Sequence, residues 1–167
     1  MRSAKGKTRA LTRPGRWRAV RGGVTAPQGF LASGVAAGIK KRGLDLAVVF
    51  SSQPASGAAV FTCNRFQAAP VVLSKKHLKA SGGQVRAVLI NSGCANACTG
   101  DKGLRDAALS ARCLASYLEI DAPQVIVAST GIIGEPLPMQ KVLKGIAAAV
   151  SALSSRGGDA AMRAIMT

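Results

Sequence analysis

The ten residues Val127-Ala128-Ser129-Thr130-Gly131-Ile132-Ile133-Gly134-Glu135-Pro136 join an apolar run to a turn. The run predicts a strand over residues 124–129 that ends in Ser129-Thr130-Gly131. Gly131 can adopt backbone angles closed to other residues, so its N–H can point into a cleft beside the Thr130 hydroxyl. Two such donors can form an oxyanion hole, which stabilises the negative oxygen of a tetrahedral intermediate in acyl transfer. By spacing alone, a plain turn with a helix-starting hydroxyl is the simpler interpretation.

Short apolar segments precede this strand and alternate with turns rich in glycine and proline. They predict strands at residues 34–40, 44–51, 58–63, 69–73 and 84–91, with a helical turn at 74–80. Consecutive strands favour a mixed or antiparallel sheet. Helical spacing then predicts a long helix over 104–118, a second over 139–150, and a short third helix with Asp159 as its N-cap. The expected fold class is α/β, with a mixed sheet covered by helices.

The segment 91–100 follows a predicted buried strand and carries two amides, two hydroxyls and two thiols. One interpretation is a pocket lining that recognises polar groups. The other is a tight loop in which Thr99 or Asp101 caps the long helix. The glycine spacing matches neither a phosphate-binding loop nor a dinucleotide fingerprint.

The formal net charge is +16, and residues 1–21 hold eight Lys or Arg and no acid. This composition predicts a disordered basic arm. A transit peptide, a nucleic-acid-binding arm or a start codon placed too far upstream would explain the same residues. No apolar run approaches the roughly 20 residues that span a bilayer, and no secretory signal is present. We therefore expect a soluble chain without a membrane partner.

The four cysteines, Cys63, Cys94, Cys98 and Cys113, give no zinc or redox pattern, because the C-x-x-x-C spacing of Cys94 and Cys98 has no second pair. They are interpreted as reduced thiols that act as small apolar residues. His77, the one histidine, lies among lysines and is expected to be exposed. No metal site is expected, and a catalytic role for Cys94 lacks a nearby base.

Several strings, in order, resemble one family: the ornithine acetyltransferases (glutamate N-acetyltransferases) of arginine biosynthesis. The resemblance runs from about Gly22 to Thr167 and excludes the basic arm. The strings that carry it are residues 22–30 (GGVTAPQGF), 34–41 (GVAAGIKK), 60–65 (VFTCNR), 68–71 (AAPV), the loop 91–100, 128–134 (ASTGIIG), Pro138-Met139 with Lys141, and 164–167 (AIMT).

The resemblance implies an enzyme that moves an acetyl group from N2-acetylornithine to glutamate. Many members also use acetyl-CoA as an acetyl donor, and none needs a cofactor. The family precursor cleaves itself ahead of a threonine, which becomes the nucleophile and forms an acetyl-enzyme. The resulting α and β chains associate as α2β2 heterotetramers. The implied fold is an α/β sandwich shared with self-processing aminopeptidases, and the implied location is the cytoplasm, or an organelle matrix if residues 1–21 are a transit peptide.

Carried over by residue, Thr130 and Gly131 match the family's oxyanion-hole pair. Thr167 matches a substrate-contacting threonine that opens a Thr-Thr-Asp string, here cut after its first residue. The self-cleavage string and the nucleophile do not occur in these residues. Residues 22–167 are therefore expected to form an incomplete, N-terminal α-chain part, inactive without its β chain.

Two other functions remain open from the residues. The charge allows a basic nucleic-acid-binding protein, but this needs exposed aromatics, and all but Phe66 of Phe30, Phe50, Phe61, Phe66 and Tyr117 lie in or beside apolar segments. The shared fold allows a self-processing aminopeptidase relative. The opening string and the Ser-Thr-Gly-Ile-Ile-Gly segment favour the acetyltransferase.

Overall fold

A computed structural model describes residues 19–20 and 22–167, so most of the arm predicted over 1–21 lies outside the described residues. Within them, four strands form one sheet in the order β1-β2-β3-β4. The strands are β1 (Phe30–Val35), β2 (Leu46–Ser56), β3 (Gln84–Cys94) and β4 (Val125–Ile132). β1 and β2, and β2 and β3, pair antiparallel, whereas β3 and β4 pair parallel. The predicted mixed sheet is confirmed.

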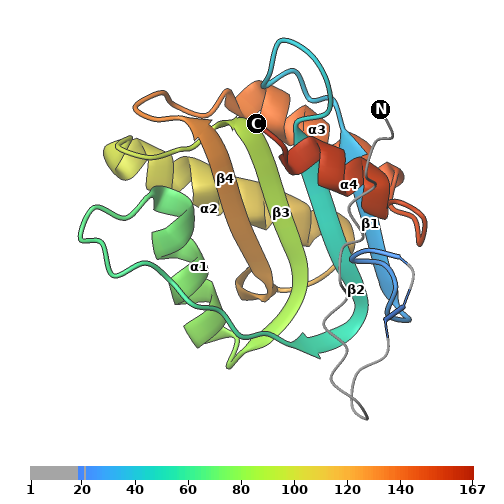
Figure 1. The fold of residues 1–167 in the computed structure, drawn as a ribbon. Coiled ribbons are helices and arrows are strands. Elements are labelled where there is room, and N and C mark those ends of the chain that lie inside the picture. The colour runs from blue at the N-terminus through green and yellow to red at the C-terminus, as the bar shows by residue number, and fades with distance from the viewer. Residues whose placement is uncertain (1–18, 21) are drawn as a thin grey trace, which may run out of the picture.

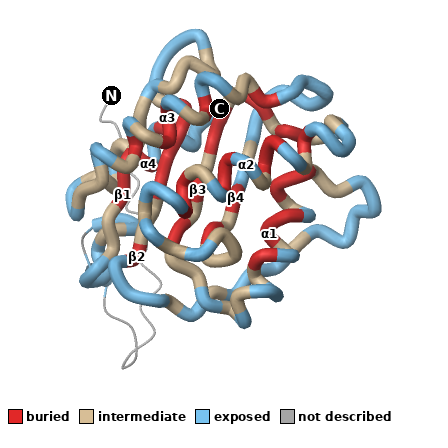
Figure 2. Tube along the Cα trace, turned by 180° about the vertical axis from the view of Figure 1, so that it is seen from behind, coloured by how far each residue is buried: buried red, intermediate tan, exposed pale blue. Residues whose placement is uncertain are grey.

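Helices cover the two faces of this sheet unequally. α1 (Ala69–Ala80), α2 (Gly100–Leu118) and α3 (Met139–Ser151) form a layer on one face, seen from behind in Figure 2. The short α4 (Gly158–Ile165) lies on the other face, in front of β1 and β2 (Figure 1). On that second face, Ala128, Thr130 and Ile132 of β4 are exposed.

The main core lies between the sheet and the three-helix layer. The predicted helical stripe is confirmed, because Ala107, Ala111, Leu114 and Ala115 of α2 are buried in this core. They pack with Leu46, Val48, Leu89, Val125 and Val127 of the strands and Val142, Ile146 and Ala149 of α3. Small side chains let the helices lie close to the sheet, which suits a chain with only 4% aromatic residues.

A second, smaller core lies beneath α4 and consists of Ala32, Ala47, Ala161 and Ala164. Gly34 of β1 lies directly against the α4 backbone, where a side chain would meet the carbonyl of Ala160. The loop before α4 is held by reciprocal bonds, with the Ala32 N–H donating to the Ser154 oxygen (2.9 Å) and the Ser154 N–H donating to the Ala32 oxygen (3.0 Å). Gly157, rather than the predicted Asp159, takes the N-cap position of α4. Asp159 lies in the first turn, where its charge favours the helix dipole.

The strand predicted at 69–73 is wrong, because these residues begin α1. The apolar run there does not distinguish a strand from a buried helix. Pro70 in the first turn and the extended Ala68 before it are typical of a helix start. Buried Pro70, Leu73, Ser74 and His77 follow helical spacing.

Two further strand predictions are wrong or displaced. Residues 57–68 form a loop instead of the strand predicted at 58–63, since β2 pairs with β3 as far as Ser56 and Val60 is fully exposed. β1 occupies Phe30–Val35 instead of 34–40, because Gly38 has a φ of +83° and residues 36–45 form a loop. Tyr117, expected in the core, is 54% exposed.

The outer edge of β4 is covered by side chains of α1 rather than by another strand. The Ser74 hydroxyl donates to the Val127 oxygen (2.8 Å) and accepts the Val127 N–H (3.0 Å). Nδ1 of His77 lies 2.7 Å from the Val125 oxygen. The expectation of an exposed His77 is therefore wrong, since its ring is buried against the first residue of β4.

We expect Ser74→Ala to lower the free energy of unfolding by about 1–3 kcal/mol, because it leaves two buried backbone groups of Val127 without a partner. Urea denaturation followed by circular dichroism measures the loss. The matched control is Ser116→Ala on the exposed face of α2, where we expect a change within about 0.5 kcal/mol. Equal effects of the two substitutions would contradict this role of Ser74.

Candidate functional site at the ends of β3 and β4

Thr130 and Gly131 lie within β4, not in a turn after it. The predicted turn is displaced because β3 is longer than expected and pairs with β4 to its end, through Ser92–Thr130, Gly93–Gly131 and Cys94–Ile132. The chain turns only at Ile133 and Gly134, where the Gly134 N–H donates to the Ala97 oxygen (2.8 Å). Thr130 and Gly131 are both exposed on the surface.

The paired glycines give this end of the ladder an unusual backbone. Gly93 has a φ of +104° and Gly131 a φ of +133°, in the region that L side chains rarely adopt. A Cβ on Gly131 would lie 2.5 Å from the Cys94 nitrogen and 2.6 Å from the Gly93 oxygen. Both the backbone angle and the close approach of the strands therefore require glycine at 131.

The polar residues of the segment 91–100 hold its own backbone in place. The Asn91 amide donates to the Cys94 oxygen (2.8 Å), and the buried Asn96 amide donates to the Gly103 oxygen (2.9 Å). The Thr99 hydroxyl donates to Oδ1 of Asn96 (2.8 Å) and makes no cap bond, although Thr99 precedes α2. The structure favours the tight-loop interpretation, without the predicted side-chain cap.

The C-terminal residues lie at the same end of the sheet. The buried Ser92 hydroxyl donates to the Ala164 oxygen at the end of α4 (2.6 Å), and the Lys40 ammonium donates to the Met166 oxygen (2.6 Å). Because Ser92 is the ladder partner of Thr130, these bonds bring the segment that ends in Thr167 to the ends of β3 and β4. Figure 1 shows the C-terminus there. Thr167 is exposed.

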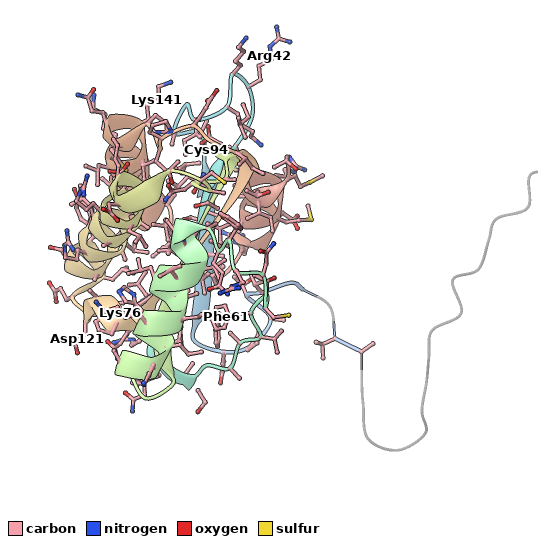
Figure 3. The ribbon with its side chains drawn as sticks, turned by 90° about the vertical axis from the view of Figure 1, so that its left-hand side faces the viewer. Arg42, Phe61, Lys76, Cys94, Asp121 and Lys141 are labelled. Atoms are coloured by element: carbon pink, nitrogen blue, oxygen red, sulfur yellow. The ribbon has the colours of Figure 1, made fainter. Side chains whose placement is uncertain are left out.

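Basic side chains surround this end of the molecule. Figure 3 shows Arg42 and Lys141 at the same end of the molecule as Cys94, the last residue of β3. The Lys141 ammonium donates to the Gly38 oxygen (2.8 Å). Asp45 is fully buried, and its carboxylate accepts the N–H groups of Ala37 (2.6 Å) and Lys40 (2.9 Å). The exposed cations would attract a ligand that carries carboxylates.

Sequence reasoning missed Asp45, Lys40 and Ser92 as the residues that organise this end. Lys40 and Ser92 act through contacts between segments far apart in the chain, since Lys40 lies 126 residues from Met166 and Ser92 lies 72 residues from Ala164. Asp45 acts within its own loop, on the N–H groups of Ala37 and Lys40, and its sequence neighbours gave no sign that it is buried. Spacing within one segment carries no signal for such contacts. Lys40 appeared only within a string that carried the family resemblance.

The histidine and the cysteines, which could act as a base, a nucleophile or metal ligands, do not form a catalytic or metal site with Thr130 and Gly131. His77 contacts the start of β4, at the opposite end of the strand from Thr130. The Cys94 thiol is buried and donates to the Glu135 oxygen (3.3 Å). All four cysteines are free, and burial raises the pKa of the Cys113 thiol. Among the residues that the structure describes, no three of His, Cys, Asp and Glu are grouped to hold a metal ion.

No helix of the described residues is long and apolar enough to cross a membrane.

A groove of about 520 Å³ lies between α1 and α2, on the helical layer. Its lining residues include Val72, Leu104 and Leu109, and none of Thr130, Gly131 and Thr167 is among them. The candidate site is therefore an open surface rather than part of this groove.

We expect Gly131→Ala to destabilise the chain more than Gly134→Ala, with losses of about 3 and 1 kcal/mol in the free energy of unfolding. Both glycines have a positive φ, but a Cβ on Gly134 meets open space, whereas one on Gly131 meets the Gly93 backbone. Chemical denaturation of both variants separates backbone strain from the clash between strands. A loss at Gly131 no larger than that at Gly134 would show that the close contact of the strands is unimportant.

Comparison with known proteins gives consistent results. The ArgJ family model matches residues 31–167. The arginine biosynthesis bifunctional protein ArgJ of Parasynechococcus marenigrum is 52% identical over 152 residues, which is 90% of this chain and 37% of the relative. The ArgJ of Caldanaerobacter subterraneus subsp. tengcongensis is 53% identical over 146 residues, which is 87% of this chain and 36% of the relative. The chain thus spans little more than a third of the length of these curated relatives.

Two solved structures share the fold. An ornithine acetyltransferase of Mycobacterium tuberculosis, complexed with ornithine, has a TM-score of 0.82 and 49% identity, over 87% of this chain and 79% of that chain. The ArgJ of Bacillus halodurans has a TM-score of 0.81 and 40% identity, over 87% of this chain and 76% of that chain. The α/β fold expected from the resemblance is confirmed. On the family match and these relatives, the chain belongs to the ArgJ family.

Proposed function

We propose that this chain is the N-terminal part of an enzyme that transfers an acetyl group from N2-acetylornithine to glutamate in arginine biosynthesis. One observation carries the proposal. Thr130, Gly131 and Thr167, the three residues predicted for the site, belong to segments that meet at one end of the sheet. They do so in a chain 49% identical to an ornithine acetyltransferase that was solved with ornithine.

The proposed roles follow from the groups available. The Thr130 hydroxyl and the Gly131 N–H would donate to the acetyl oxygen as it becomes negative, and Thr167 would contact the ornithine part of the substrate. A threonine hydroxyl on the β chain would attack the acetyl carbon, the C–N bond of acetylornithine would break, and ornithine would leave with the proton. The glutamate amine would then attack the acetyl-threonine ester and release N-acetylglutamate. Acetyl-CoA would serve as an alternative acetyl donor, and no cofactor is needed.

The surface around the site suits the proposed β-chain partner. α1 covers β4 only as far as Val127. Further along the strand, Thr130, Gly131 and Ile132 are exposed, and the exposed fraction of Ile132 is 56%. An exposed strand edge with an apolar face is a surface that another chain segment can cover. We propose that the β chain of the same precursor does so, in an α2β2 assembly in the cytoplasm, and that residues 1–167 alone are inactive.

The test is a hybrid enzyme. Residues 1–167 are fused to the C-terminal portion of the Caldanaerobacter relative that this chain does not match, and ornithine release from N2-acetylornithine and glutamate is measured. We expect turnover by the fusion and none by residues 1–167 alone. Thr130→Ala should lower kcat by roughly 100- to 1000-fold, as does loss of one oxyanion-hole donor, whereas Thr130→Ser should retain most activity because it keeps the hydroxyl.

Thermal unfolding of each fusion variant shows whether a loss of rate follows from a loss of folding. Turnover by residues 1–167 alone would contradict the proposed dependence on a β chain. Full activity of a folded Thr130→Ala fusion would contradict the proposed role of the hydroxyl.

A further inference from the structure

Two side chains hold the C-terminal segment at the proposed site. The Ser92 hydroxyl bonds the Ala164 oxygen, where α4 ends, and the Lys40 ammonium bonds the Met166 oxygen, one residue before Thr167. Met166 and Thr167 lie beyond the helix and are exposed. Among the side-chain hydrogen bonds of the described residues, the one from Lys40 is the contact made to this two-residue segment.

Lys40 is itself fixed by a buried carboxylate. Asp45 is fully buried, and Oδ2 accepts the Lys40 N–H (2.9 Å) while Oδ1 accepts the Ala37 N–H (2.6 Å). The Asp45 backbone bonds both flanking strands, since its N–H donates to the Val35 oxygen (2.9 Å) and its oxygen accepts the Ser92 N–H (2.8 Å). The loop that carries Lys40 is therefore tied to β1 and β3 by charge-assisted and backbone bonds.

The Lys40 side chain also lies against the glycine pair. A Cβ on Gly93 would lie 2.7 Å from Cγ of Lys40, so the aliphatic part of the lysine occupies the space that the missing side chain leaves. Gly93 is the ladder partner of Gly131. Lys40 thus extends from Gly93, the partner of Gly131 in the proposed oxyanion-hole strands, to the Met166 carbonyl.

We propose that Lys40 is a positioning residue that holds Met166 and Thr167 beside Thr130 and Gly131. This role rests on the proposed function, since Thr167 is the residue to be positioned for substrate. The long lysine side chain suits the task because its stem packs on Gly93 while its ammonium, with three donors, reaches the carbonyl. Lys40 need not touch substrate in this role.

The first test measures the mobility of the C-terminal segment by ¹⁵N relaxation of residues 1–167, without reference to activity. We expect Lys40→Met to lower the order parameters of Met166 and Thr167 to below about 0.6, the range of flexible backbone. The melting temperature should stay unchanged. Lys40→Arg, which keeps a charged donor, should restore the order. The matched control is Lys41→Met, which removes a charge from the adjacent exposed lysine and should leave both values as in the parent chain.

Two outcomes would overturn the proposal. Order parameters unchanged in Lys40→Met would show that the lysine does not hold the segment. A fall in the melting temperature of Lys40→Met but not of Lys41→Met would show that Lys40 supports the fold as a whole instead of positioning one segment.

The second test uses the fusion enzyme described above. We expect Lys40→Met to raise the KM for N2-acetylornithine by about tenfold, the effect of losing one hydrogen bond to a charged group. kcat should change less, Lys40→Arg should restore KM, and Lys41→Met should have no effect. An unchanged KM in Lys40→Met would contradict the positioning role. If no fusion turns over, the proposed function fails, while the relaxation experiment still decides whether Lys40 holds the segment.

Discussion

The parallel pairing of β3 with β4, carried through to its last residues, is the constraint on which the rest of the structure depends. It places Ser92 opposite Thr130 and Gly93 opposite Gly131. That register is compatible only with glycine at 131, because the two backbones approach too closely there for a side chain. A shift by one residue would move every side chain of β4 to the other face of the sheet. The exposed hydroxyl of Thr130 and the backbone of Gly131 are therefore fixed by the ladder rather than by a flexible turn.

The surroundings of this ladder divide it into a structural and a functional half. At the start of β4, Ser74 and His77 of α1 satisfy backbone groups of Val127 and Val125, so this half of the edge is sealed. At its end, the strand is exposed and cationic side chains lie nearby. Asp45, although buried, adds order at this end because it binds backbone N–H groups of the loop that carries Lys40. Rigid strands thus support an open surface where a further segment can complete the site.

Much of this fold could be predicted from the spacing of apolar residues within each segment, because that spacing indicates which side chains are buried. The apolar stripe of α2 and the short β-branched segments of β2, β3 and β4 each gave the right element. The pattern failed where an apolar run had two solutions. The pattern of Val71-Val72-Leu73 predicts a strand. The helix is the better structure because it lets Ser74 and His77 bond the backbone of β4. The strand predicted at 58–63 was wrong because residues with a high strand propensity form a strand only where a neighbouring strand is available to pair with them.

The candidate site shows the same division. Thr130 and Gly131 could be proposed from their residue types, but their place inside a strand depends on the length of β3, which the sequence did not reveal. The contacts of Lys40 with Met166 and of Ser92 with Ala164 join segments far apart in the chain, so neither periodicity nor spacing could predict them. Thr167 stays a prediction that rests on resemblance, although the structure brings its segment to the site.

A crystal structure of the fusion enzyme trapped as its acetyl-enzyme tests the central claim most directly. We expect the acetyl oxygen to lie about 2.7–3.1 Å from the Thr130 hydroxyl and the Gly131 nitrogen. An acetyl oxygen that points away from both groups, bonded only to residues of the added segment, would contradict it.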